Sequence, residues 1–336
     1  MAGKRLHSFS LFDKFQYEKH MVFLKHTGLG FLLLILSSCE EPFDPQFYEE
    51  EGQLVVVSNF NPNSPIEVYV SVSQSVVEEA QTAYLSNAEV DVLHGDTLLV
   101  TLALATKMDG DRIIPYYTHP NFVPKEGRWY TLRVRAEGYA PVSATSYIPP
   151  QVKLDSINLE NLATETPEAP SNEEETQVYT YDINLQFLDP AGENNYYHLN
   201  VYQQVKKQVS QGDTTATELL TYKIFFSPAL NTNHVTVHHD GGILLEDTPF
   251  DGTYARLSFP VRFVLDLGQR EELGDLLVEF RSVSREYFLF HTSLSKQKEQ
   301  GKDPLHEPVL VYDNIQNGHG IFAGFNSSQD SVVIGN

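Results

Sequence analysis

Apolar and polar residues alternate along most of the chain that follows residue 52. A period of two places every second side chain on one face of a strand, so this pattern predicts strands that bury one face. The runs are short, and turn-forming residues separate them, which is typical of a β-sandwich. They cover residues 54–57, 66–72, 88–93, 97–102, 178–188, 196–209, 219–226, 255–266 and 276–281.

One segment has the period of a helix instead. Over residues 283–300, apolar side chains recur at three- and four-residue spacing, which places them on one helical face. Ser282 or Ser284 can cap the start of this helix, and Gly301 can end it. The sequence therefore predicts one helix packed on a sheet, with these side chains facing inward: Val283, Tyr287, Phe290 and Leu294.

Two adjacent prolines, Pro149 and Pro150, divide the strand pattern into two parts. We expect a mostly β protein of two β-sandwich-like domains. Residues 53–150 form the N-terminal sandwich, and residues 151–336 form a C-terminal β domain that carries the helix. Within the first part, residues 127–139 resemble the closing hairpin of transthyretin-like and immunoglobulin-like modules, in which a Gly turn leads into an alternating strand.

Two connections of the C-terminal part have a distinctive composition. Residues 163–176 combine several glutamates with two prolines and can bury little, so they predict an acidic loop. Residues 188–195 contain Pro, Gly and Asn between two long strands, and we expect a hairpin there.

The N-terminal segment has the features of a targeting signal. An apolar run over residues 29–36 is shorter than the roughly 20 residues of a spanning helix and fits a signal peptide. The following Ser37-Ser38-Cys39 completes what resembles a bacterial lipobox, whose cysteine thiol receives a diacylglyceryl group. We therefore predict a signal peptide over residues 1–38, with Met21 as the expected true start, and lipidation of Cys39. The alternative is an ordinary buried cysteine.

The net charge of the chain excludes one class of binding partner. It carries 23 Lys and Arg against 45 Asp and Glu, a net charge of -22. An acidic surface repels phosphate backbones, so nucleic-acid binding is not expected. Acidic residues follow the lipobox directly and form a predicted tether over residues 39–52. This arrangement resembles the surface-export signal of Bacteroidota lipoproteins, so we expect an outer-membrane protein facing the cell exterior.

Motifs for metals and cofactors are weak. Cys39 is the only cysteine, which excludes Cys-rich metal sites. His234, His238 and His239 are the densest group of potential ligands, but on a strand only the first two share a face. We predict no metal and no cofactor.

A short segment near the end of the chain matches a relaxed dinucleotide fingerprint. Too little chain follows it for the βαβ unit that such a motif needs. We interpret the segment as a tight turn, with a backbone-lined ligand loop as the alternative. It consists of Asn317, Gly318, His319 and Gly320.

Aromatic side chains are the strongest candidates for ligand contacts. Trp129, Tyr196 and Tyr197 can stack against a glycan or peptide, and packing in the core is the alternative. The chain contains neither a Gly-x-Ser-x-Gly elbow nor a His-Glu-x-x-His helix, so we do not expect an enzyme.

Several segments together carry a family likeness. After the lipobox come a turn at 188–190 followed by the Tyr196-Tyr197 pair, and the terminal sequence NGHGIFAG over residues 317–324. Together they resemble the Bacteroidota lipoprotein family catalogued as domain of unknown function 4249, across residues 36–336. The resemblance implies the outer membrane and a TonB-dependent transporter as partner.

Three functions follow as hypotheses. The first is an accessory or ligand-capture lipoprotein for a transporter, anchored in outer-membrane lipid through acylated Cys39. The others are a surface hydrolase acting on glycan or peptide, and an adhesive or structural module of the envelope.

Overall fold

The fold is taken from a computed structural model, which describes residues 52–74, 82–166, 176–211, 214–301 and 309–334. The predicted signal peptide, Cys39 and nearly all of the tether lie outside these residues. Among the described residues, no helix is both long and apolar enough to cross a membrane.

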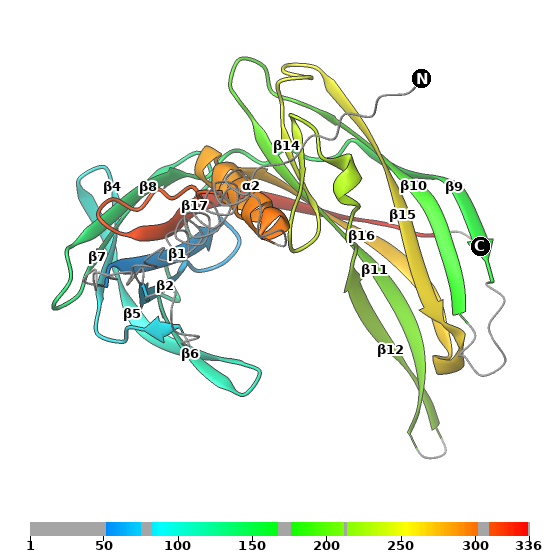
Figure 1. The fold of residues 1–336 in the computed structure, drawn as a ribbon, viewed down its shortest axis with the longest axis horizontal. Helices are drawn as coiled ribbons and strands as arrows, with labels where there is room; N and C mark the ends of the chain where they lie inside the picture. The colour runs from blue at the N-terminus through cyan, green and yellow to red at the C-terminus, as the bar shows by residue number, and fades with distance from the viewer. Residues whose placement is uncertain (1–51, 75–81, 167–175, 212–213, 302–308, 335–336) are drawn as a thin grey trace, which may run out of the picture. The chain divides into compact units, whose positions relative to one another are not determined.

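Strands make up most of the described structure, as Figure 1 shows. The strands of the first part are β1 (Leu54–Phe60), β2 (Glu67–Val72), β3 (Ala83–Tyr84), β4 (Glu89–His94), β5 (Thr97–Asp109), β6 (Arg112–Thr118), β7 (Trp129–Arg135) and β8 (Val142–Tyr147). The second part contains β9 (Ser156–Glu165), β10 (Thr176–Leu188), β11 (Tyr196–Gln211), β12 (Thr214–Lys223), β13 (Val235–Val237), β14 (Ile243–Glu246), β15 (Tyr254–Asp266), β16 (Glu271–Val283) and β17 (His319–Val332). Two short 3-10 helices, η1 (Pro228–Leu230) and η2 (Leu267–Gln269), lie between strands.

Two sheets organise these strands. The larger sheet follows the order β13-β14-β11-β16-β17-β1-β2-β6-β5-β4-β7-β8, with β12 paired to β11 and β3 paired to β2. The smaller sheet is β15-β10-β9. The predicted mostly β, sandwich-like fold is confirmed, and the described residues contain a single α-helix.

The last described strand connects distant parts of the sequence. β17 pairs in parallel with β1, where Val55 lies opposite His319, and pairs antiparallel with β16, where Val283 lies opposite Phe325. In Figure 1 the red β17 therefore runs beside the blue β1. Strands from the first and last described parts of the sequence are therefore neighbours in the sheet, which a local sequence pattern does not reveal.

Alternating burial explains why these segments are strands. Along β1, Leu54, Val56, Ser58 and Phe60 are buried, and the residues between them are more exposed. One apolar cluster is built on β1, β2, β4, β7 and β8, and a second is built on β10, β11, β15 and β16. A third, smaller cluster lies beneath the α-helix. The division into two domains at residue 150 stays a prediction.

The predicted helix is α2, Arg285–Gln300. Its start is shifted by two residues because β16 continues to Val283. Ser284 is the N-cap, and its hydroxyl accepts a hydrogen bond from the backbone N–H of Tyr287. Tyr287 and Phe288 bury the inner face of the helix against the third cluster.

The predicted hairpin at residues 188–195 is wrong. β10 lies in the small sheet and β11 in the large one, so the segment crosses between sheets. Within the segment, Asp189 is buried and accepts hydrogen bonds from the Tyr197 hydroxyl and the Gly252 amide. These bonds satisfy the buried carboxylate and help to hold the crossover in place. Of the predicted acidic loop, residues up to Glu165 belong to β9, and 167–175 lie outside the described residues.

Candidate functional site

An aromatic cleft brings together residues that are far apart in the sequence. β7, β8, the start of β11 and the first turn of α2 contribute to its walls, which enclose about 420 Å³. This volume lies within the range of small-ligand pockets. Three prolines, Pro149, Pro150 and Pro190, add rigid apolar surface to the same walls.

Trp129 and Tyr147 form the most accessible part of the cleft. They are opposite each other across β7 and β8, with ring centroids 5.2 Å apart and ring planes tilted by 33°. Trp129 keeps 53% of its surface exposed, which is a large apolar area to leave in water. Such a pair offers an aromatic face to a bound molecule.

Tyr196 forms another aromatic wall. Its ring stacks on Phe288 of α2 at a centroid distance of 4.7 Å, which fixes its orientation. Burial raises the pKa of the Tyr196 hydroxyl, while the nearby Arg285 guanidinium opposes this shift. The phenol therefore stays neutral at physiological pH and can act as a hydrogen-bond donor.

Tyr197 follows Tyr196 and also contributes to the cleft wall. Its ring is fully buried and stacks on Phe280 at 5.1 Å. Burial, together with the hydrogen bond to Asp189, raises the pKa of its hydroxyl. The ring of Tyr197 therefore supports the core and presents no face to a ligand.

Charged groups flank the aromatic walls. Glu193 and Arg285 are exposed and line the cleft, and within the described residues neither forms a salt bridge. Glu286 accepts a hydrogen bond from the Ser146 hydroxyl at 3.0 Å. Burial, followed by the charges of Glu193 and Glu126, raises the pKa of Tyr147. The acidic groups are thus close enough to act on the aromatic pair.

The segment 317–320 lies away from the cleft and has a packing role. Asn317 has a φ of 62° and Gly320 a φ of 112°, both in the left-handed region. A Cβ on Gly320 would lie 2.0 Å from the Val56 carbonyl oxygen, and one on Gly318 would lie 2.5 Å from that of Leu54. The glycines therefore allow β17 to approach β1. His319 is exposed, 3.5 Å from Asp313.

The histidines group differently from the sequence pattern. His238 contacts His291 of α2, with Nε2 and Nδ1 3.1 Å apart, while His234 lies near Glu246. The Asp240 amide donates to His238 Nδ1, so the proton of a neutral His238 is on Nε2 and is donated to His291. This assignment accounts for both imidazoles as a hydrogen-bonded pair.

The pKa values of His238, His291 and the neighbouring His198 are unusually low. His198 is bonded to the Tyr287 hydroxyl at 2.9 Å, and that hydroxyl accepts from Arg281 at 3.0 Å. Burial, with smaller effects from neighbouring positive groups, lowers the pKa of His238 to about 4. For the same reasons the pKa values of His198 and His291 lie well below the usual range. All three imidazoles are neutral at pH 7.

Three carboxylates also converge in the described residues: those of Asp189, Asp247 and Asp251, with oxygens within 4.8 Å of one another. Each accepts a backbone N–H, from Gly252, Asn195 and Gly192 respectively. Burial raises the pKa of Asp247, and the two neighbouring carboxylates add to the shift. These hydrogen bonds hold the segment of residues 189–195 against the segment of residues 247–252, so the three carboxylates have a structural role.

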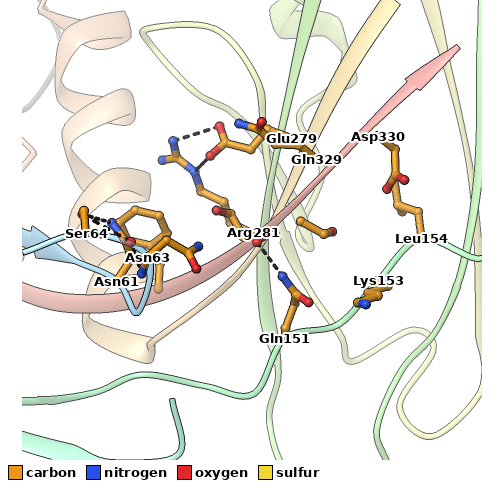
Figure 2. A pocket seen from close by; sticks show the side chains of 13 residues that line it. Asn61, Asn63, Ser64, Gln151, Lys153, Leu154, Glu279, Arg281, Gln329 and Asp330 are labelled. Carbon is orange, nitrogen blue, oxygen red and sulfur yellow. Dashed lines mark hydrogen bonds and ion pairs between the residues drawn. The ribbon is translucent and has the colours of Figure 1, made fainter. Parts of the chain in front are cut away.

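A second, more polar cavity of about 770 Å³ is shown in Figure 2. Its central charge is already paired, since the Arg281 guanidinium points at Glu279 and donates to both carboxylate oxygens at 2.8 and 2.9 Å. Arg281 also lies over the Phe325 ring at 4.7 Å. The guanidinium is thus engaged within the protein, so we take the aromatic cleft as the candidate site.

The fold and the cleft define a β-sandwich-like protein with an aromatic pocket of ligand size. Residues 40–331 match the family described as Domain of unknown function (DUF4249), and the chain belongs to this family. No curated protein matches the chain.

Sequence reasoning identified only part of the cleft. Trp129 and Tyr196 were expected to contact a ligand and do line it. Tyr147, Glu193 and Arg285 were missed because strand pairing and helix packing bring them there. The alternation within residues 142–147 was the one available signal, since it indicates a strand that can pair with the one containing Trp129.

Proposed function

We propose that the protein is an acylated outer-membrane lipoprotein that faces the cell exterior and captures a small ligand for a TonB-dependent transporter. The aromatic cleft carries the ligand-capture part of this proposal, because exposed aromatic faces from distant segments converge there. The lipobox supports the anchor, and the resemblance to Bacteroidota lipoproteins supports the transporter as partner.

The anchor follows from the chemistry of Cys39. A thiol accepts a diacylglyceryl group through a thioether, and several acyl chains on one residue hold a protein at a membrane where one chain would bind only marginally. The acidic residues that follow Cys39 carry the same sign of charge as anionic lipid and are repelled by it.

Binding is favoured over hydrolysis by the character of the walls. The aromatic rings and prolines provide stacking surface, which holds a ligand without activating it. For a glycan substrate, the hydrolase alternative requires two carboxylates placed on either side of the scissile bond. Replacing Glu193 and Glu286 together by Gln separates the two functions, because a hydrolase loses turnover whereas a binding protein shows none with either form.

The anchor is tested by Cys39→Ala. We expect the variant to leave the membrane fraction of the producing cells, whereas the matched control Ser38→Ala stays membrane-bound. Membrane fractionation with metabolic labelling by a fatty acid measures both effects. An unlabelled wild-type protein, or a Cys39→Ala variant that fractionates like wild type, contradicts the anchor.

The partnership is tested by affinity purification of the full chain from detergent-solubilised membranes. We expect a TonB-dependent transporter to co-purify with the wild type and with a Trp129→Ala variant, because the cleft serves the ligand. Recovery of the lipoprotein alone in repeated purifications contradicts the partnership.

A further inference from the structure

The ligand class can be inferred from two charged side chains that line the aromatic cleft, Glu193 and Arg285. This step rests on the proposed ligand-capture function. We propose that the cleft selects a short peptide, with a cationic group on Trp129, Tyr147 and Glu193 and a carboxylate on Arg285.

The proposed binding position for the cation combines an aromatic face with a carboxylate. A cation is attracted to the face of an indole ring, and Trp is the best of the aromatic side chains for this contact. The 53% exposure of Trp129 leaves its ring accessible, and Tyr147 packs beside it at 5.2 Å. Glu193 lines the same cleft and supplies a full negative charge. The net charge of -22 also attracts cations to the surface.

The proposed binding position for the carboxylate is Arg285, in the first turn of α2. A guanidinium binds a carboxylate through two parallel hydrogen bonds. Arg285 is exposed and lines the cleft, and within the described part of the chain it has no salt bridge that a ligand must displace. The cavity of Figure 2 differs here, because its Arg281 is bound by Glu279.

The two charges decide between peptide and sugar. A neutral sugar stacks on aromatic rings, but it would cover Glu193 and Arg285 without giving either a counter-charge, and a desolvated charge without a partner is unfavourable. A peptide with an ammonium or guanidinium and a carboxylate pairs with both. The pairing makes peptide binding the better electrostatic match for these walls.

The fluorescence of Trp129 reports binding directly, because it is the only tryptophan in the chain. The full, acylated protein in detergent is titrated with N-acetylated Lys-Ala-Ala carrying a free carboxylate. Two matched analogues replace the lysine by norleucine or the carboxylate by an amide, and maltotriose is the sugar probe. The variants are Glu193→Gln and Arg285→Gln, and Glu218→Gln and Arg112→Gln are exposed controls outside the cleft.

We expect the tripeptide to bind and each analogue to bind about tenfold more weakly. Glu193→Gln should remove the preference for lysine over norleucine, and Arg285→Gln the preference for acid over amide, while both controls keep both preferences. These crossed losses link each ligand charge to one residue.

Three results overturn the inference. Analogues that bind as tightly as the parent tripeptide contradict charge recognition. Absence of tripeptide binding contradicts the peptide class. Maltotriose binding that changes Trp129 fluorescence while the tripeptide does not shows that the ligand is a sugar, in which case the proposed capture function survives and the peptide assignment fails.

Discussion

Two buried imidazoles, those of His198 and His238, and the partly buried imidazole of His291 lie beside one guanidinium in this protein. The ring of His238 is 4.9 Å from that of His198 and 5.1 Å from that of His291, and Arg281 contacts the same Tyr287 hydroxyl as His198. A proton added to any of these rings would be poorly solvated and close to other positive groups. The folded cluster therefore favours the neutral form of each of these histidines.

This arrangement predicts acid sensitivity. The unfolded chain binds these protons near pH 6.5, whereas the folded pKa of His238 is about 4. Because the folded pKa values are depressed, the free energy of unfolding should fall as pH drops from about 6.5 to 4, by up to about 1.4 kcal/mol per pH unit for each imidazole. Urea unfolding between pH 7.5 and 4 measures this slope.

His238→Gln is the matched variant for the acid prediction, because Gln keeps a polar side chain that does not titrate. Its slope should be shallower than that of the wild type, and the exposed-site variant His94→Gln should keep the wild-type slope. A wild-type unfolding free energy that is flat over this pH range contradicts the assignment.

The sequence indicates which side chains can contact a ligand better than it indicates which side chains lie next to one another. It identified Trp129 and Tyr196 as ligand candidates, and both line the cleft. It grouped His238 with His234, yet the fold brings His238 to His291 of α2 instead. A helix and a strand loop that are distant in sequence meet there, and no spacing rule connects them.

The elements themselves were largely predictable, because each carries its own period. Alternation identified most strands, and three- and four-residue spacing identified α2. The segment 188–195 was assigned as a hairpin because its Pro, Gly and Asn residues suit a turn as well as a crossover. Composition alone does not separate the two, because the partners of buried Asp189, which are Tyr197 and Gly252, lie outside the segment.

The start of α2 offers a prediction for a single element. Ser284 is buried, its hydroxyl accepts from the Tyr287 amide, and that hydroxyl lies 3.2 Å from the Ser146 hydroxyl. Ser284→Ala should lower the free energy of unfolding by about 1 to 2 kcal/mol, because a buried amide loses its cap. Chemical denaturation measures the change.

Ser284→Thr is the control, since threonine keeps the hydroxyl and should retain more of the stability. Equal stability of Ser284→Ala and the wild type would contradict the role of the cap. Loss of tripeptide binding without loss of stability would instead show that the cap acts mainly by positioning Arg285.

At the scale of the whole molecule, β17 is central to the larger sheet. It lies between β16 and β1 and contributes buried apolar side chains to two of the clusters. Its glycines permit an approach to β1 that a Cβ would block. Periodicity predicts neither this parallel pairing nor its register, because both depend on contacts between opposite ends of the chain.

Truncation tests this position. A chain ending after Gln316 leaves β1 paired only with β2 and β16 paired only with β11, and it loses several buried side chains, each worth about 1.5 to 3 kcal/mol. The sum is comparable with the stability of a typical domain. We expect the truncated chain to be insoluble or readily proteolysed, and a chain lacking only residues 335 and 336 to fold. A soluble, protease-resistant truncated chain contradicts this role of β17.

The parallel contact between β1 and β17 also determines when part of the larger sheet can fold. Val55 can pair with His319 only after all the residues between them have been synthesised, so this part of the larger sheet forms late. Contacts of such long range slow folding. For the proposed lipoprotein, which would cross a membrane unfolded, this delay keeps β1 unpaired with β17 until both strands have crossed.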